Sequence, residues 1–277
     1  MQFFNKTAPI GIFDSGIGGL TVAKRIISML PNENIVYFGD TARVPYGSKS
    51  NSTVIEYAIQ DAQFLLNKNV KLIIVACNTA SSVALDSLKE KYNIPVIGMI
   101  EPGANLAIEK TKNKRVGVIG TISTINNKAY SEELKKIDSE IIVFEKPCPL
   151  FVPIAEEGWL THEATKLIAI EYLQEFIDAD IDTLILGCTH YPLLAETIQH
   201  IMGEKVTLID SGFAASLQVE NYLEGRGVRN DSHQIGTHQF YVSDLPNKFK
   251  TVAERFLGSK VSHIEKIDVE SLLNHKL

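Results

Sequence analysis

The amino-acid sequence predicts an α/β protein whose sheet content is mainly parallel. Short runs rich in Ile and Val recur along the 277 residues, and longer helix-like stretches separate them. The runs are apolar on both faces, which is typical of strands that are buried on both sides in a parallel sheet. Apolar residues make up 45% of the chain and charged residues 22%, as in ordinary globular proteins. This alternation of strand and helix predicts the α/β class.

Eight short apolar runs are the expected strands. Between them lie helix signals, such as Thr53-Val-Ile-Glu56, which matches a capping box ahead of an amphipathic run to Leu66. We therefore expect a helix there. The expected strands are Pro9–Phe13, Ile35–Phe38, Leu72–Ala76, Pro95–Ile97, Val116–Ile119, Ile141–Phe144, Thr183–Leu186 and Val206–Ile209.

A short internal repeat bears on the number of domains. Ser15 ends one strand and is followed 62 residues later by Cys77, while Thr121 ends another and is followed 67 residues later by Cys188. Two similar lobes would bring these two thiols to one cleft from opposite sides. Any α/β chain offers pairs of this length, so one large domain stays open as the alternative. Gly98–Gly103 is the expected crossing between lobes.

Charge and cysteine usage exclude several classes of partner. The formal net charge of −6 argues against broad binding to nucleic acid or anionic lipid, because both rely on basic patches. The sequence shows neither a signal-peptide pattern at its start nor an apolar run long enough to span a membrane. Three widely spaced cysteines fit a reducing compartment. We expect a cytoplasmic protein that binds a small molecule.

Cys77 and Cys188 are the candidate reactive groups. Each follows a buried strand, and the carboxyl ends of such strands form the ligand crevices of α/β sheets. A helix expected from about Ala80 would direct its N-terminus at Cys77 and lower the pKa of the thiol from about 8.5. Pro192 suits the first turn of a helix after Cys188. For either cysteine taken alone, a small core residue is the alternative.

Two other uses of the cysteines can be compared with a reactive pair. Cys188-Thr-His190 offers two zinc ligands, but structural zinc needs four and the sequence has no second pair, so no metal is expected. A cysteine hydrolase needs only one Cys and one His, and it leaves the second thiol without a role. Cys148 lies between two prolines, without a strand-to-helix setting, and is expected to pack in the core.

Two polar loops follow the first two strands. Asp14-Ser-Gly-Ile-Gly-Gly19 opens a helix and could receive a carboxylate at its backbone, although Asp14 and Ser15 could instead cap that helix. Thr21 stands where a dinucleotide fingerprint requires its third glycine, so nucleotide binding is weakly supported. The loop from Asp40 to Gly47 could offer a tyrosine hydroxyl and a backbone N–H, or be an ordinary loop.

Taken together, four motifs resemble those of the bacterial glutamate racemases. They occur in the order of that family, and both cysteines are present. The resemblance extends from about residue 9 to about 212, where it includes Asp210-Ser-Gly212. The motifs are Gly11-Ile-Phe-Asp-Ser-Gly-Ile-Gly-Gly-Leu20, Tyr37-Phe-Gly-Asp40 through Pro45-Tyr-Gly47, Ala76-Cys-Asn-Thr-Ala-Ser81 and Leu186-Gly-Cys-Thr-His-Tyr-Pro-Leu-Leu194.

The resemblance implies an architecture and an activity. It implies two α/β lobes of similar topology around a cleft that holds the active site, with residues 1–98 and 210–277 in the first lobe and residues 99–209 in the second. The C-terminal segment would thus return to the first lobe. It further implies a homodimer that needs no pyridoxal phosphate, no other cofactor and no metal. The product would be D-glutamate for peptidoglycan.

The resemblance also implies roles for individual residues. Cys77 and Cys188 would be the two acid/base groups, with Asp14 and His190 assisting them. Asp40 and one of Glu156 and Glu157 are further candidates. The residues that would contact or position glutamate are Asp14, Ser15, Tyr46, Gly47, Asn78, Thr79, Thr121, Thr189 and His190.

Racemisation explains why two thiols are needed. A proton must leave one face of the α-carbon and another must arrive on the opposite face, so a two-base route needs a group on each side. An aspartate racemase would use the same pair for a shorter substrate. A cysteine hydrolase would need one thiol and form a thioester, and a non-catalytic amino acid-binding protein would need neither.

Overall fold

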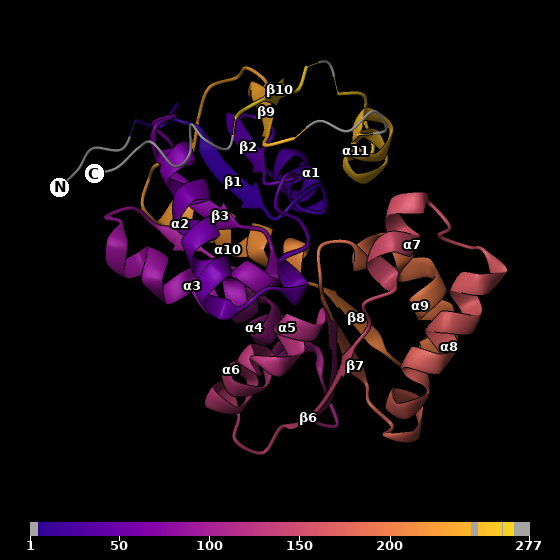
Figure 1. Cartoon of the computed structure of the whole chain (residues 1–277). Coiled ribbons are helices and arrows are strands. Elements are labelled where there is room, and N and C mark those ends of the chain that lie inside the picture. Colours follow the sequence, from indigo (N-terminus) through magenta and orange to yellow (C-terminus); the bar gives the residue numbers. More distant parts are fainter. Residues whose placement is uncertain (1–4, 245–248, 262, 269–277) are drawn as a thin grey trace.

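The computed structural model describes residues 5–244, 249–261 and 263–268. In this part of the chain the strands form two separate sheets, and the strand pairs within each sheet are parallel. Figure 1 shows the sheets in two lobes, one of which carries both ends of the described chain. The outer ends of the expected first lobe, residues 1–4 and 269–277, lie outside the described residues.

Sheet A has the strand order β10-β9-β2-β1-β3-β4. Side chains alternate between its two faces, because successive residues of a strand point in opposite directions. Ile12 and Ile74 pack in the core on one face, and Phe13 and Val75 in the core on the other. Its strands are β1 (Ile10–Asp14), β2 (Ile35–Gly39), β3 (Leu72–Val75), β4 (Val96–Ile97), β9 (His238–Val242) and β10 (Glu265–Lys266).

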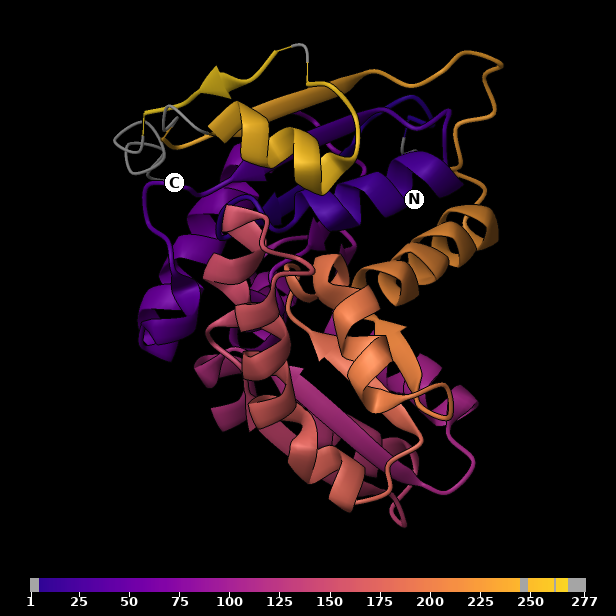
Figure 2. The same ribbon diagram turned by 90° about the vertical axis from the view of Figure 1, so that its right-hand side faces the viewer.

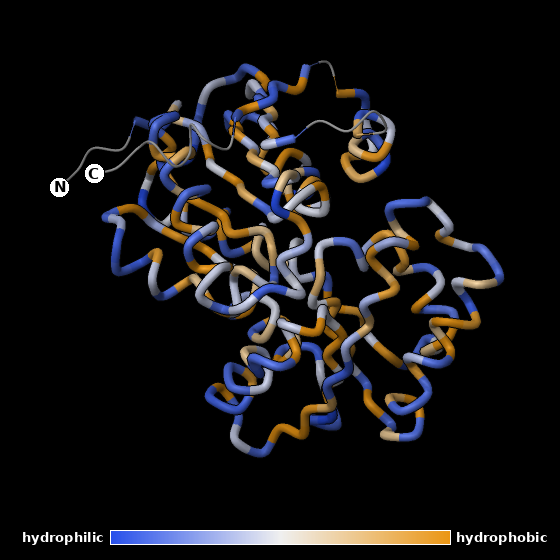
Figure 3. Tube along the Cα trace, viewed as in Figure 1, coloured by the Kyte–Doolittle hydropathy of each residue, from blue (hydrophilic) through white to orange (hydrophobic). Residues whose placement is uncertain are grey.

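Sheet B has the strand order β6-β5-β7-β8 and is also covered on both faces. Ile119 and Leu186 pack on one face, and Val118 and Ile185 on the other. Hydrophobic residues accordingly run along the inner strands in Figure 3, while the outer helices alternate between hydrophobic and hydrophilic segments. Its strands are β5 (Arg115–Gly120), β6 (Ile142–Pro147), β7 (Thr183–Gly187) and β8 (Thr207–Asp210).

The two sheets share one topology. In sheet A the first strand lies between the second and third, and β5 lies in the same way between β6 and β7. The strand order therefore reverses beside β1 and beside β5, and open α/β sheets bind ligands at such a reversal, outside the carboxyl ends of the strands. Ser15 and Cys77 follow β1 and β3, and Thr121 and Cys188 follow β5 and β7. The two similar lobes are confirmed.

Helices cover both sheets and connect them. α4 carries the chain from β4 to β5, and Figure 2 shows α11 lying along α1, beside the second lobe. None of the described helices has the length and apolar character needed to cross a membrane. The helices are α1 (Leu20–Met29), α2 (Asn51–Leu66), α3 (Asn78–Lys91), α4 (Ile100–Lys110), α5 (Ile122–Asn126), α6 (Ala129–Ile137), α7 (Phe151–Glu157), α8 (Glu163–Asp178), α9 (Ala195–Met202), α10 (Ser211–Gly225) and α11 (Phe249–Leu257), with short 3-10 turns η1 (Tyr46–Ser48) and η2 (Tyr191–Leu194).

The structure confirms the eight expected strands and corrects some details. The capping box at Thr53 is wrong, because α2 begins at Asn51 and its N-cap is Ser50, whose side chain accepts from the Thr53 N–H. Gly98–Gly103, expected as a crossing, includes the first turn of α4. β9 and β10 were not expected. They add to the outer edge of sheet A beside β2, where burial is incomplete and the sequence lacks an apolar run.

Candidate active site

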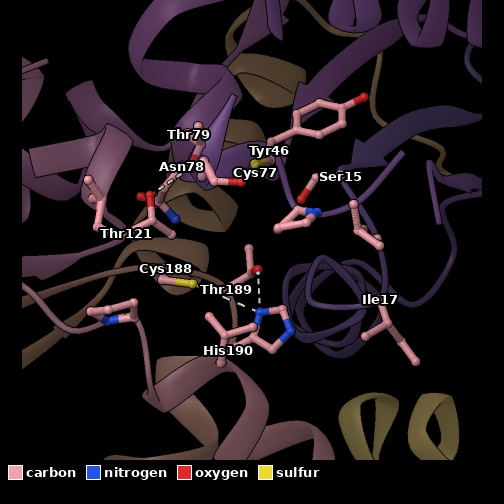
Figure 4. Close-up of a pocket in the computed structure, with 18 of the residues that line it drawn as sticks. Ser15, Ile17, Tyr46, Cys77, Asn78, Thr79, Thr121, Cys188, Thr189 and His190 are labelled. Carbon is pink, nitrogen blue, oxygen red and sulfur yellow. Dashed lines mark hydrogen bonds between the residues drawn. The ribbon is translucent and has the colours of Figure 1, made fainter. Parts of the chain in front are cut away.

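A cavity lies where the carboxyl ends of the two sheets face each other. Its volume is about 260 Å³, slightly below the roughly 300–1,000 Å³ usual for drug-sized ligands, so it suits a smaller molecule. Figure 4 shows Cys77 and Asn78 on one side of it and Cys188 and His190 on the other. Both lobes contribute to its walls. The expected residues that line it are Ser15, Tyr46, Gly47, Cys77, Asn78, Thr79, Thr121, Glu156, Cys188, Thr189 and His190.

Cys77 lies at the N-terminus of α3, where it is the N-cap. The Ala80 N–H donates to its Sγ at 3.4 Å, and the side chain is buried. Burial raises the pKa of Cys77 to about 12; the charge of Asp14 adds to this, and the Ala80 N–H and the Ser15 hydroxyl oppose it. The expected lowering of this pKa is therefore wrong, because burial outweighs the helix terminus. Cys77 is a thiol at neutral pH.

Asp14 lies at the end of β1, behind Cys77, and does not itself line the cavity. It is only 1% exposed, and burial raises the pKa of its carboxyl group although the charge of His190 acts in the opposite direction. The N-cap of α1 is Gly19, which makes no side-chain hydrogen bond. The alternative in which Asp14 or Ser15 caps that helix is therefore wrong.

Cys188 lies at the end of β7 beside an imidazole–carboxylate pair. Its Sγ is 3.9 Å from His190 Nδ1, and the other ring nitrogen of His190 lies 3.0 Å from Glu156 Oε1. Burial lowers the pKa of His190, but the hydrogen bonds and charges of Cys188 and Glu156 outweigh it and raise the pKa to about 10. At neutral pH His190 is an imidazolium that faces the sulfur.

Several contacts join the lobes around the cavity. Thr21 Oγ1 donates to the Thr189 carbonyl at 2.9 Å, and the hydroxyls of Thr79 and Thr121 lie 2.9 Å apart. The glycine loop after β1 packs closely against the second lobe, since a Cβ atom on Gly18 would lie 2.1 Å from Thr189 Oγ1. The lobes are thus in contact beside the cavity, and Gly18 permits their close approach.

Tyr46 contributes its ring and not its hydroxyl. The ring lines the cavity, while the hydroxyl lies 2.9 Å from Asp61 and also contacts Asp40. Figure 4 shows the hydroxyl of Tyr46 pointing away from the two cysteines. The expectation that this hydroxyl faces the substrate is wrong. Arg43 binds the same two carboxylates, so this buried network anchors the loop that presents Gly47.

Of the three remaining candidate residues, one lines the cavity and two do not. The adjacent glutamates are both exposed, but only Glu156 lines the cavity. Asp40 is buried in the network below Tyr46 and does not line it either. Within the described ranges, no group of three or more His, Cys, Asp or Glu side chains is placed to hold a metal ion.

Sequence reasoning missed two parts of the site. Part of the wall between the polar groups is apolar, and its residues lie in loops and in α5 and α7. Phe256 of α11 was also missed; its ring meets the His190 ring edge-on, with the centroids 5.1 Å apart. The amphipathic pattern of residues 249–257 could have predicted the helix that carries Phe256. The missed apolar residues of the wall are Ile17, Val44, Pro45, Ile122, Pro149, Val152 and Pro153.

Comparison with known sequences decides the family. Residues 18–218 match the sequence model of the Asp/Glu/Hydantoin racemase family. A glutamate racemase of Geobacter metallireducens is 49% identical over 262 residues, which cover 95% of this chain and 97% of that protein. The chain belongs to the Asp/Glu/hydantoin racemase family. A glutamate racemase of Chlorobaculum tepidum is 50% identical over 259 residues, with 93% of this chain and 95% of that protein covered.

Solved structures of this racemase family agree with the fold. The crystal structure of glutamate racemase from Francisella tularensis in complex with D-glutamate matches with a TM-score of 0.90 at 44% identity, over 96% of this chain and 99% of that chain. An aspartate racemase of Picrophilus torridus has a TM-score of 0.56 at 19% identity, over 80% of this chain and 94% of that chain, and shares the fold. The resemblance to glutamate racemases is confirmed.

Proposed function

We propose that this chain interconverts L- and D-glutamate without a cofactor, by proton transfer between the α-carbon and two cysteines. The observation that carries the proposal is the placement of Cys77 and Cys188 at equivalent strand ends of two similar lobes, on either side of one cavity. The family match favours a racemase over the hydrolase and the binding protein. The relatives at 49% and 50% identity are glutamate racemases, which favours glutamate over aspartate.

The two cysteines take opposite roles in each direction of the reaction. Cys188, whose Sγ lies 3.9 Å from His190 Nδ1, is the group that we assign to remove the α-proton from one enantiomer. Cys77, whose pKa is about 12, is the thiol that delivers its proton to the opposite face. After one turnover Cys188 holds a proton and Cys77 is the thiolate, so the same pair is set for the reverse reaction. Asp14 favours the thiol at Cys77, and Glu156 holds the proton on His190.

The cavity has to stabilise negative charge on the substrate. Without an electron-sink cofactor the α-proton is weakly acidic, and preorganised donors in a site closed to water lower the barrier. Hydroxyl and amide side chains from both lobes are the donors we assign to the two carboxylates, and the Gly47 backbone N–H joins them. These side chains are Ser15, Asn78, Thr79, Thr121 and Thr189.

We also infer the setting of the enzyme. It works in the cytoplasm as a homodimer, binds neither nucleic acid nor membrane, and makes D-glutamate for peptidoglycan. The net charge of −6 and three cysteines without disulfides support this assignment, together with the resemblance of the motifs. We divide the lobes at residues 98 and 210, because the strands of sheet A lie outside residues 99–209 and the strands of sheet B lie within them, apart from Asp210 at the end of β8.

Deuterium exchange tests the proposal directly. The purified protein is incubated with L-glutamate in D2O, without added cofactor, and optical rotation is followed together with deuterium at the α-carbon. We expect rotation to be lost while deuterium enters the α-position. If the folded protein exchanges the α-hydrogen of neither enantiomer of glutamate, the assignment is excluded. Exchange with aspartate alone would identify aspartate as the substrate.

A further inference from the structure

Tyr130 lies behind the cavity, on α6 of the second lobe. Its side chain is 1% exposed, and its hydroxyl donates to Asn78 Oδ1 at 2.6 Å. Asn78 directly follows Cys77 and lines the cavity. A buried tyrosine of one lobe therefore holds a cavity side chain of the other, although Tyr130 itself does not line the cavity.

The ring of Tyr130 fits between two glycines. A Cβ atom on Gly103, inside α4, would lie 3.1 Å from Tyr130 Cε1, and a Cβ atom on Gly187 would lie 3.1 Å from Cε2. Both separations are tighter than ordinary contacts. Gly187 directly precedes Cys188, so the ring is seated between the helix that connects the lobes and the strand that ends at the second cysteine.

The orientation of the Asn78 amide follows from a neighbouring hydrogen bond in which donor and acceptor are known, because a carbonyl oxygen can only accept. Ser211 Oγ donates to the Leu186 carbonyl at 3.2 Å, so it has no proton left to give and accepts from Asn78 Nδ2 at 3.3 Å. The amide nitrogen therefore faces Ser211, and the amide oxygen faces Tyr130. The second N–H of Asn78 Nδ2 has no acceptor among the described residues and is available to the cavity that the side chain lines, beside Cys77 and Thr79 in Figure 4.

We propose that Tyr130 is a positioning residue, which fixes Asn78 as an N–H donor toward a carboxylate of the substrate. The proposal rests on glutamate as the substrate. An amide has a donor end and an acceptor end of nearly the same shape, and only the donor end attracts a carboxylate. Without the Tyr130 hydroxyl, the Asn78 oxygen loses its donor and only the 3.3 Å hydrogen bond to Ser211 orients the amide, so the side chain turns more easily and can present its oxygen, which repels the carboxylate.

The predicted effect falls on substrate binding. The substrate carboxylates are charged before the proton transfer as well as during it, and loss of an interaction present in both states raises KM and leaves kcat unchanged. We expect Tyr130→Phe, which keeps the ring between its glycines, to raise KM for both enantiomers about tenfold, as for one lost hydrogen bond to a charged group. A purely structural role would lower thermal stability and leave KM unchanged.

A double-mutant cycle tests whether Tyr130 acts through Asn78. KM, kcat and the thermal midpoint are measured for the wild type, Tyr130→Phe, Asn78→Ala and the double variant. Tyr92→Phe is the control, because its hydroxyl donates to the Ile59 carbonyl at 3.0 Å, outside the cavity. We expect Tyr130→Phe to raise KM in the wild type and to change it by less than about twofold in Asn78→Ala.

Three results would overturn the inference: an unchanged KM in Tyr130→Phe, the same increase in both backgrounds, or the same increase in Tyr92→Phe. A calorimetric measurement of D-glutamate binding distinguishes failure of this inference from failure of the proposed function. A wild type that binds D-glutamate and does not racemise it would refute the function alone, and the inference would then stand on a tenfold weaker Kd in Tyr130→Phe. A wild type that does not bind D-glutamate would refute both.

Discussion

The three cysteines permit a comparison within one chain. Cys77→Ala and Cys188→Ala each remove one of the two proposed proton-transfer groups, so we expect racemisation to fall by at least about 100-fold in either variant. The cysteine that remains can still remove and return a proton on its own face. In D2O each variant should exchange the α-hydrogen of one enantiomer with retention, and the two variants should select opposite enantiomers.

Cys148 is the control for these substitutions. It is fully buried in the core of the second lobe and does not line the cavity. Cys148→Ala should racemise glutamate at the wild-type rate, and loss of a buried side-chain atom should lower the free energy of unfolding by about 1 kcal/mol. Equal loss of activity in all three variants would point to general damage by alanine and not to two acid/base groups.

His190 links the charge of the site to the stability of the protein. Its pKa rises from 6.5 to about 10 on folding, so the folded state holds the proton more tightly than the unfolded state. The resulting stability is complete below pH 6.5 and is lost as the pH rises through about 10. The difference in unfolding free energy between the wild type and His190→Gln should therefore shrink over this range, measured by denaturant titration at each pH.

An exposed histidine gives the matched control for that titration. His200→Gln on α9 changes the same side chain at the surface, away from Glu156 and Cys188. We expect its difference from the wild type to lack the decline seen for His190→Gln. A difference for His190→Gln that stays constant from pH 6 to pH 10 would show that His190 does not carry the additional charge in the folded state.

The composition of the site could be predicted from sequence, but its electrostatics could not. Residues next to strand ends, such as Cys77 and Thr121, follow from the order of strands and from the motifs. The direction of the Tyr46 hydroxyl depends on Asp61, which lies in the middle of α2 and belongs to no motif. The high pKa of Cys77 depends on burial, and burial is set by residues that are distant in sequence.

The glycine loop after β1 is an element whose function depends on close contact between lobes. Gly18→Ala places a methyl group where Thr189 Oγ1 lies 2.1 Å away, so the lobes cannot approach as closely. Small displacements of reacting groups reduce rates strongly, and we expect kcat/KM to fall about 100-fold. The unfolding free energy should change by less than the activation free energy that corresponds to this loss of kcat/KM, because the lobes can move apart and relieve the contact.

A second glycine separates this contact from the general effect of an added methyl group. Gly225 ends α10, and a Cβ atom there would meet nothing within 4 Å. Gly225→Ala should keep the wild-type kcat/KM and stabilise the helix by about 0.5 kcal/mol, because alanine loses less backbone entropy. Wild-type kcat/KM in Gly18→Ala would contradict the role given to the loop.

Strands of the sheet interiors could be predicted because they are apolar on both faces. The outer strands β9 and β10 could not, since they are only partly buried and their sequences keep polar residues such as Gln239. The pairing of β9 with β2 joins residues about two hundred positions apart, and no local pattern records it. The capping error at Thr53 was local: Ser50 and Thr53 are both good caps, and the chain uses the earlier one.

The two lobes combine matching topology with unequal chemistry. Cys77 is buried near a carboxylate, whereas Cys188 faces an imidazolium. The two enantiomers of glutamate have equal free energy in water, so kcat/KM must be equal in both directions for the wild type and for every variant. Unequal cysteines can therefore make kcat differ between the two directions, and KM likewise, but kcat/KM stays the same in both directions. Any measured inequality of that ratio would indicate an error in the assay.

Opening of the lobes can limit turnover, because both lobes line the cavity and contact each other beside it. Asn51 Nδ2 donates to Asn127 Oδ1 at 2.8 Å, across the two lobes and away from the cysteines. Asn51→Ala should ease opening by about 0.5 kcal/mol, which raises kcat and KM together about twofold. Faster release makes proton transfer more rate-limiting, so the isotope effect of α-deuterated glutamate on kcat should increase.

Asn113→Ala is the control for lobe opening, because Asn113 Nδ2 donates to the Asp180 carbonyl at 2.8 Å within the second lobe. It removes a surface amide without breaking a contact between lobes, so its kcat and isotope effect should match those of the wild type. An isotope effect that is equally large in the wild type and Asn51→Ala would mean that proton transfer already limits kcat. Opening of the cleft would then be faster than proton transfer. The contacts between the lobes would serve to exclude water and would not set the rate of product release.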